Sequence, residues 1–351
     1  MIRRLLLSIS LLALSGCSAL GHWSQAAGGH LGIVRAARPV SDWLADPATP
    51  ADLAERLRLS QQLRDYATAR LALPDNNSYR RYADLHRTAA VWNVIAAPEF
   101  GFTLKTWCYP VMGCAGYQGW FNLDEAKRRA ETLKAEGWEA QVQAIPAYST
   151  LGWSRLLGGD PLLNTFIRYP DGELAAMIFH ELAHQRVYVS DDTGFNEAYA
   201  SAVELIGARQ WLAGNAKALA AFEAGRERRA RFLALAREGK RRLQAVYDGP
   251  ADQRSAGKAA VMDELRARAK QEAPGYEAWF QRANNASFAI LAAYDELVPA
   301  FERLFEREGR DWAKFHAAVE ALKPLSRDER RATLKAQGGL HDADPTPSPT
   351  Q

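Results

Sequence analysis

Two histidines four residues apart, His180 and His184, enclose a glutamate in the stretch HELAH. On an α-helix, positions i and i+4 lie on one face one turn apart, so both imidazoles can reach the same ion. Zinc accepts histidine nitrogens, and a catalytic zinc site leaves one position open for water. Glu181 is turned far enough to avoid the metal yet can reach that water as a general base. The spacing therefore predicts a hydrolytic zinc centre rather than a helix with two polar-face histidines.

A third ligand is expected from the next helical segment. Residues 190–194 have the composition of a turn, and residues 195–212 resume a helical pattern. We predict that Glu197, in the first turn of that helix, is the ligand, because its place beside the turn brings it back toward His184. Glu204, two turns later on the same face, is predicted to accept an N–H from a ligating histidine. The reverse assignment of the two glutamates remains open.

The segments before the motif predict the elements that position it. Asp171 precedes the apolar run LAAMIF and is a candidate N-cap for the histidine helix. Residues 50–73 show the apolar recurrence of a helix, and residues 123–137 predict an amphipathic helix that Gly137 ends. Residues 138–148 alternate apolar and polar side chains, as a half-buried strand does. A helix–strand unit is therefore expected in front of the motif.

Charge-dense helical patterns follow the motif. Residues 215–247 and 256–273 are joined by DGPADQRS and predict an antiparallel helical pair whose Arg and Lys runs are solvated faces. Residues 284–308 continue the helical pattern through Pro299, and residues 79–97, upstream, form a further segment of mixed polarity. We expect a mainly α fold of the α+β class, with a zincin-like core, a small β element and a long helical pair after the site.

The N-terminal residues predict export. MIRR is a basic n-region and LLLSISLLAL is an apolar run too short to span a bilayer. LSGC follows, and the segment resembles a bacterial lipoprotein signal, in which residues 1–16 are removed and Cys17 carries acyl chains. Ser18 follows rather than an aspartate, which in such lipoproteins indicates the outer membrane. We expect an outer-membrane lipoprotein facing the periplasm; an ordinary signal with a chance cysteine is the alternative.

Two cysteines remain in the exported chain, Cys108 and Cys114 in WCYPVMGC. Export takes them to an oxidising compartment, and they flank a turn that contains proline and glycine. We therefore expect a disulfide between them. A zinc knuckle is the weaker alternative, because the spacing is wrong and no histidine lies nearby in the sequence.

Length and composition limit the number of domains and the class of partner. The chain has 351 residues, of which 48% are hydrophobic and 24% charged, enough for one substantial core over residues 17–340. Residues 341–351 form a polar, proline-rich tail that cannot pack. Lys and Arg (44) nearly balance Asp and Glu (41), so nothing indicates a nucleic-acid partner.

The motif resembles that of the gluzincin branch of zinc metallopeptidases, in which HExxH and a downstream glutamate bind zinc. The chain as a whole resembles the family of putative bacterial aminopeptidases. The resemblance extends over the blocks LALPDNNSYRRYADLHRTAAVWNVIAAPEF, WCYPVMGCAGYQGWF, AIPAYSTLGW, DPLL, HELAHQRVYVSDDTGFNEAYASAVE and NNASFAILAAYDELVPAF. It implies that His180, His184 and Glu197 bind zinc and that Glu181 is the catalytic base. The GxMEN-type stretch that holds a substrate amino group in well-characterised zinc aminopeptidases is missing from the sequence.

The expected function is that of a zinc-dependent peptidase, lipid-anchored in the cell envelope, which hydrolyses peptides through a Glu181-activated water. A non-enzymatic envelope lipoprotein with a structural or vestigial zinc site is the alternative. The intact Glu181 argues against it, since a structural site needs ligands but no base. An amidase acting on cell-wall peptides is a third possibility. Tyr148, Tyr188 and Tyr199 are candidate donors to the oxyanion of the reaction, with a half-buried aromatic as the alternative for each.

Overall fold

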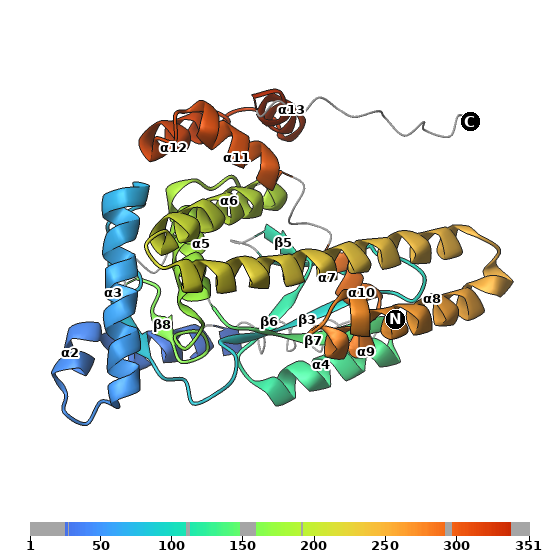
Figure 1. The fold of residues 1–351 in the computed structure, drawn as a ribbon. Coiled ribbons are helices and arrows are strands. Elements are labelled where there is room, and N and C mark those ends of the chain that lie inside the picture. Colours follow the sequence, from blue (N-terminus) through green and yellow to red (C-terminus); the bar gives the residue numbers. More distant parts are fainter. Residues whose placement is uncertain are drawn as a thin grey trace, which may run out of the picture.

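The structure is a computed structural model. It describes residues 25–26, 28–109, 113–147, 159–190, 192–291 and 297–337. The predicted signal peptide (residues 1–16), Cys17 and the predicted tail (residues 341–351) lie outside the described residues. The described chain is mainly helical with three small sheets, in agreement with the expected class (Figure 1).

The central sheet is built on β3 (Val91–Pro98), which pairs antiparallel with β6 (Gln118–Trp120) on one side and β7 (Trp138–Ile145) on the other. The half-buried strand expected at residues 138–148 is therefore confirmed as β7. It follows α4 (Leu123–Ala135), whose cap Asn122 accepts from two backbone N–H groups, and the predicted helix–strand unit is present.

Both faces of β3 are covered, which explains its nearly continuous apolar sequence VWNVIAAP. Trp92 and Val94 pack with α4, whereas Ile95 and Ala97 pack against α10 (Asn285–Leu291). Because such a strand does not alternate polar and apolar residues, the segment 79–97 gave no strand signal in the sequence.

A second sheet orders β1 (Arg38–Pro39), β2 (Arg81–Ala83) and β8 (Leu162–Leu163), with the first pair antiparallel and the second parallel. It joins the loop before the motif helix to the N-terminal part of the chain. The helix α2 (Val40–Ala45) follows β1 directly and packs on α3 (Ala51–Leu71).

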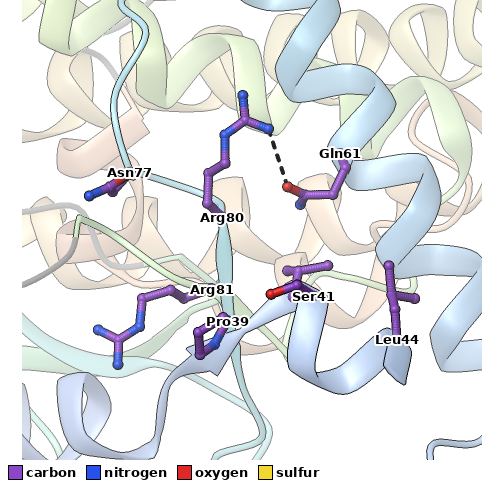
Figure 2. A pocket seen from close by; sticks show the side chains of 8 residues that line it. Pro39, Ser41, Leu44, Gln61, Asn77, Arg80 and Arg81 are labelled. Atoms are coloured by element: carbon purple, nitrogen blue, oxygen red, sulfur yellow. Dashed lines mark hydrogen bonds between the residues drawn. The ribbon is translucent and has the colours of Figure 1, made fainter. Parts of the chain in front are cut away.

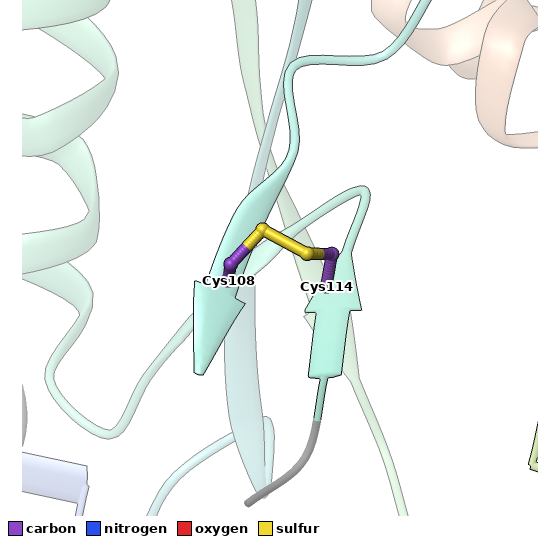
Figure 3. The surroundings of a disulfide bond; sticks show 2 residues. All are labelled: Cys108 and Cys114. Carbon is purple, nitrogen blue, oxygen red and sulfur yellow. A yellow bond between two sulfur atoms is a disulfide. The ribbon is translucent and has the colours of Figure 1, made fainter. Parts of the chain in front are cut away.

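The third sheet is the hairpin of β4 (Trp107–Tyr109) and β5 (Gly113–Ala115). Cys108 and Cys114 lie directly opposite each other on its two strands and form the predicted disulfide, with Cα atoms 3.9 Å apart (Figure 3). The bond closes a loop of only six residues of separation, so its entropic contribution to stability is at the low end for disulfides.

The main core surrounds α5 (Asp171–Arg186) and α6 (Thr193–Leu212), which pack extensively on each other. The helix predicted at residues 50–73 is confirmed as α3 and packs on α5. The prediction of Asp171 as N-cap is wrong by one position. Pro170 is the N-cap, without a side-chain bond, and Asp171 is the first helical residue, paired with Arg56 at 2.5 Å. Its charge lies at the positive end of the helix dipole.

The predicted helical pair is confirmed as α7 (Ala216–Asp248) and α8 (Arg254–Glu272), which Figure 1 shows as the longest element pair, joined through the short η2 (Ala251–Gln253). Some of its arginines, while still partly exposed, also form ion pairs between the two helices. Arg268 pairs with Glu238 across the two helices at 2.7 Å, so part of the charge run stabilises the pair.

The C-terminal helices are α9 (Glu277–Arg282), α11 (Val298–Arg307), α12 (Trp312–Glu320) and α13 (Arg327–Gln337). Pro299 lies in the first turn of α11, where its missing N–H costs no helical hydrogen bond. The proline thus belongs to the start of a helix and not to the interior of one. Across the described ranges, no helix combines the length and the apolar character needed to cross a membrane.

Candidate metal centre

The facing sides of α5 and α6 bring three predicted ligands together. One donor atom each from His180, His184 and Glu197 lies within 4.8 Å of the others. The two Nε2 atoms of the histidines are 3.1 Å apart. One carboxylate oxygen of Glu197 lies 3.4 Å from Nε2 of His180, and the other lies 3.6 Å from Nε2 of His184.

These spacings fit a small divalent ion that prefers nitrogen and oxygen ligands. Four donors arranged tetrahedrally at about 2.0–2.1 Å from an ion are separated from one another by about 3.3 Å. The three donors are also shielded, with side chains 16%, 7% and 27% exposed for His180, His184 and Glu197. The three groups contact one another in this shielded position, where unpaired polar groups are costly.

The pKa shifts of the three groups have different causes. Burial lowers the pKa of His180, but its bonds to Glu197 and Glu204 outweigh burial and hold that pKa well above its usual value. Burial and the charge of His180 lower the pKa of His184 to about 4. Burial raises the pKa of Glu197, but the two histidines outweigh burial, and the net pKa is lowered. At neutral pH, Glu197 is therefore ionised and His184 neutral, the forms that bind metals.

Glu204 contacts the far side of the first histidine. Its Oε2 lies 2.8 Å from Nδ1 of His180, and its Oε1 accepts from Nη1 of Arg226 on α7 at 3.3 Å. Nδ1 of His180 donates to this carboxylate, which leaves Nε2, the nitrogen that faces His184 and Glu197, as the one that would bind a metal after losing its proton. The sequence led us to expect this contact of Glu204, but gave no signal for Arg226.

Glu181 is half-buried on α5 and is not one of the three clustered donors. Tyr79 lies near it: burial, followed by the charges of Glu181 and Asp160, raises the pKa of Tyr79 well above its usual value. Tyr79 is almost fully buried and has a positive φ of 64°, which is uncommon for a bulky side chain. Nothing in the sequence identified Tyr79 as a neighbour of Glu181, because the two are far apart along the chain.

A network of polar side chains joins α5 to the segment before β2. Gln185 accepts from Asn76 at 2.8 Å and donates to Ser78 at 3.2 Å. Asp160 is 1% exposed, and its backbone carbonyl accepts from the N–H of Tyr79 at 2.7 Å. The network ties the segment before β2 to the residue next to His184, so the helix that presents the histidines is fixed on this side as well.

The turn between α5 and α6 is closed by side chains. Asn196 donates to the carbonyl of Val189 at 2.6 Å and accepts from its N–H at 2.9 Å. Asp192 caps α6 by accepting from the N–H of Phe195. The helix begins at Thr193, so Glu197 is its fifth residue. The prediction that Glu197 lies in the first turn is therefore wrong. Although Glu197 lies just after the first turn of α6, its carboxylate still contacts both histidines.

The three tyrosines considered as oxyanion donors have different positions. Tyr148 lies outside the described residues. Tyr199 is fully buried and its hydroxyl is 2.8 Å from Nδ1 of His316, so it belongs to the core. Tyr188 is 40% exposed, and burial together with the charge of Glu197 raises its pKa. Tyr117, which the sequence did not single out, is equally exposed and is affected by the same two causes.

A cavity of about 550 Å³ lies elsewhere, between α2, α3 and β2 (Figure 2). None of the clustered ligands lines it. Arg80, one of its two arginines, already pairs with Asp65 at 2.8 Å and contacts Gln61 at 3.5 Å. The cavity therefore does not belong to the metal centre.

Comparison with known proteins identifies the family of the chain. No curated protein and no solved structure matches the chain. Residues 21–334 match the model of a family described as putative aminopeptidase. This match covers most of the 351 residues, including both helices of the centre. The chain therefore belongs to the putative aminopeptidase family.

Proposed function

We propose that the protein is a zinc-dependent peptidase whose ion is held by His180, His184 and Glu197. The observation that carries the proposal is the set of three donor spacings between 3.1 and 3.6 Å, in a shielded position between two packed helices. Membership of the aminopeptidase family supports peptide substrates. The order of the histidine helix and the glutamate helix supports a zincin-like core.

When bound, zinc would supply a Lewis acid that polarises the peptide carbonyl and activates a water. Glu181 would take the proton of that water on a carboxylate oxygen and deliver it to the leaving nitrogen. Glu204 would keep the proton of His180 on Nδ1, so that Nε2 remains a ligand. Glu197 would contribute a negative charge that favours a divalent cation.

A catalytic site is better supported than a structural one. Structural zinc sites have four protein ligands, whereas catalytic ones have three and an open position. Among the described residues the cluster has three donors. Glu181 is next to the ligands and outside their set, which a general base requires and a structural site does not.

We further propose that the protein is a lipoprotein, anchored through Cys17 in the outer membrane and facing the periplasm. The disulfide between Cys108 and Cys114 supports export, because such bonds persist in oxidising compartments. Peptides in that compartment would be the substrates.

The test is a digest of a peptide library, read by mass spectrometry, with wild type, Glu181→Gln and Glu173→Gln. Glu173 is an exposed glutamate in the first turn of the same helix and serves as the matched control. Wild type and the control should cleave, and Glu181→Gln should be slower by roughly 100-fold or more while retaining zinc. Equal cleavage by Glu181→Gln and wild type would exclude the mechanism.

A further inference from the structure

The outer side of α6 is covered by the C-terminal helices, as Figure 1 shows for α11 and α12. Phe195 packs on Phe301 of α11 with ring centroids 5.1 Å apart, and Tyr199 contacts His316 of α12. Glu197 lies two residues from each, which on a helix places it on the opposite side. The ligand helix is therefore held between α5 on its metal-facing side and the C-terminal helices on the other.

The last helix, α13, contacts the start of α6 through charges. Asp192, the N-cap of α6, has a side chain that is 0% exposed. Its Oδ2 accepts from Nη1 of Arg330 at 3.0 Å, and its Oδ1 accepts from Nη2 of Arg331 at 2.6 Å. Arg330 is itself 2% exposed and lies over the ring of Phe195 at 5.5 Å. A residue near the end of the described chain thus reaches the turn of the metal centre.

Loss of the contact between Asp192 and the arginines of α13 would affect the start of α6. A buried carboxylate and a buried guanidinium are each costly when unpaired, so the burial of Asp192 is favourable because the arginines of α13 pair with it. Asp192 is also the cap that starts α6, and Asn196 closes the same turn onto Val189. Undocking of α13 would therefore remove two charged partners from the cap and leave the first turns of α6 held less firmly, and Glu197 lies at the end of that segment.

We propose that α13 is a C-terminal latch in which Arg330 and Arg331, as positioning residues, hold the Asp192 cap and thereby place Glu197 as a metal ligand. The inference rests on the proposed zinc site. Because binding free energies are reciprocal, docking of α13 strengthens zinc binding, and zinc binding in turn strengthens docking of α13.

The first experiment measures zinc affinity of the full chain by competition with a chromophoric chelator. Arg331 is the residue to change, since its side chain is 30% exposed and its replacement leaves Arg330 paired. Arg331→Gln should raise the zinc dissociation constant by roughly 5-fold or more, and Arg331→Lys should recover part of the loss. Arg268→Gln is the matched control: Arg268 has a comparable exposure of 27% and pairs with three glutamates, but lies on α8.

The second experiment uses only the wild-type protein and does not depend on any variant folding. Amide hydrogen exchange is compared with and without zinc. Zinc should slow exchange in α13 and in the first turns of α6, and leave α8 unchanged.

The outcomes separate the two proposals. If Arg331→Gln binds zinc within twofold of Arg268→Gln, or if zinc leaves exchange in α13 unchanged, the latch is excluded while the zinc site stands. If wild type binds zinc no more tightly than His180→Ala, the zinc site fails and the latch fails with it.

Discussion

The imidazole of His180 contacts two glutamates on its two sides. Its Nδ1 lies 2.8 Å from Glu204, and its Nε2 lies 3.4 Å from Glu197. The two glutamates are seven residues apart on α6, so one helix supplies both a donor to the cluster and an acceptor that contacts the other side of the same histidine. We therefore expect the two carboxylates to have different roles.

Replacing each glutamate by alanine should affect zinc content and activity differently. Glu197→Ala removes a donor and should abolish stoichiometric zinc together with activity. Glu204→Ala leaves all three donors and should weaken zinc affinity or activity by roughly 10–100-fold. The measurements are zinc content by elemental analysis and turnover of a library peptide. Full zinc retention in Glu197→Ala, with loss in Glu204→Ala, would reverse the assignment.

Gly207 permits the close packing of the ligand helix on two neighbours. A Cβ at this position would lie 2.8 Å from Leu71 of α3 and 3.0 Å from Phe179 of α5, and both side chains are fully buried. Gly207→Ala should therefore destabilise the fold by roughly 1–3 kcal/mol, despite the better helix propensity of alanine.

Urea unfolding of Gly207→Ala and Gly214→Ala measures this effect. A Cβ at position 214 meets no atom within 4 Å, so the control should unfold close to wild type. A Gly207→Ala protein as stable as the control would show that the three helices can separate at no cost.

The local patterns of the sequence predicted much of this fold, and the contacts between distant segments were not predictable. The helix α4 before Gly137, the strand β7 after it and the pair α7–α8 each follow from periodicity within one segment. Tyr79 beside Glu181 could not be predicted, because the contact joins residues about a hundred positions apart. The same holds for Asp192 with Arg330, since pairing across the fold leaves no mark on the spacing of either segment.

The predicted starts of the helices α5 and α6 were wrong for a related reason. Asp171 and Glu197 were each placed within one turn of their observed positions, because a capping residue is chosen by competition between neighbours. In the first case Pro170 took the cap position, and in the second Asp192 started the helix before the apolar pattern began.

Anchoring is tested at Cys17. Cys17→Ser should abolish acylation, and the protein should be recovered uncleaved or soluble, because a short apolar run alone does not hold a mature protein in a membrane. Membrane fractionation and the mass of the N-terminal peptide are the measurements. The double change of Cys108 and Cys114 to serine is the control, and it should leave acylation intact. A mature, acylated Cys17→Ser protein would contradict the anchor.

His316 predicts how the stability of the protein depends on pH. Its Nε2 donates to the carbonyl of Leu71 at 2.8 Å, so Nδ1 is unprotonated and accepts from the hydroxyl of Tyr199. Burial lowers the pKa of His316 to about 4, and the nearby charge of Arg186 contributes. Protonation of Nδ1 would reverse its hydrogen bond with Tyr199, a residue of α6, because the hydroxyl could then only accept from this nitrogen.

The sign follows from the lower pKa in the folded state. As pH falls below about 6.5, the unfolded chain takes up this proton first, so stability is lost between about pH 6.5 and pH 4 and then levels off. The loss from this one group should reach at most about 3 kcal/mol. Urea unfolding at several pH values, with chelator present, should show a smaller decrease for His316→Gln than for wild type over this range. His86→Gln changes a side chain that is 88% exposed and should follow wild type. If His316→Gln and wild type lose stability in parallel as pH falls, the buried histidine is not the group responsible.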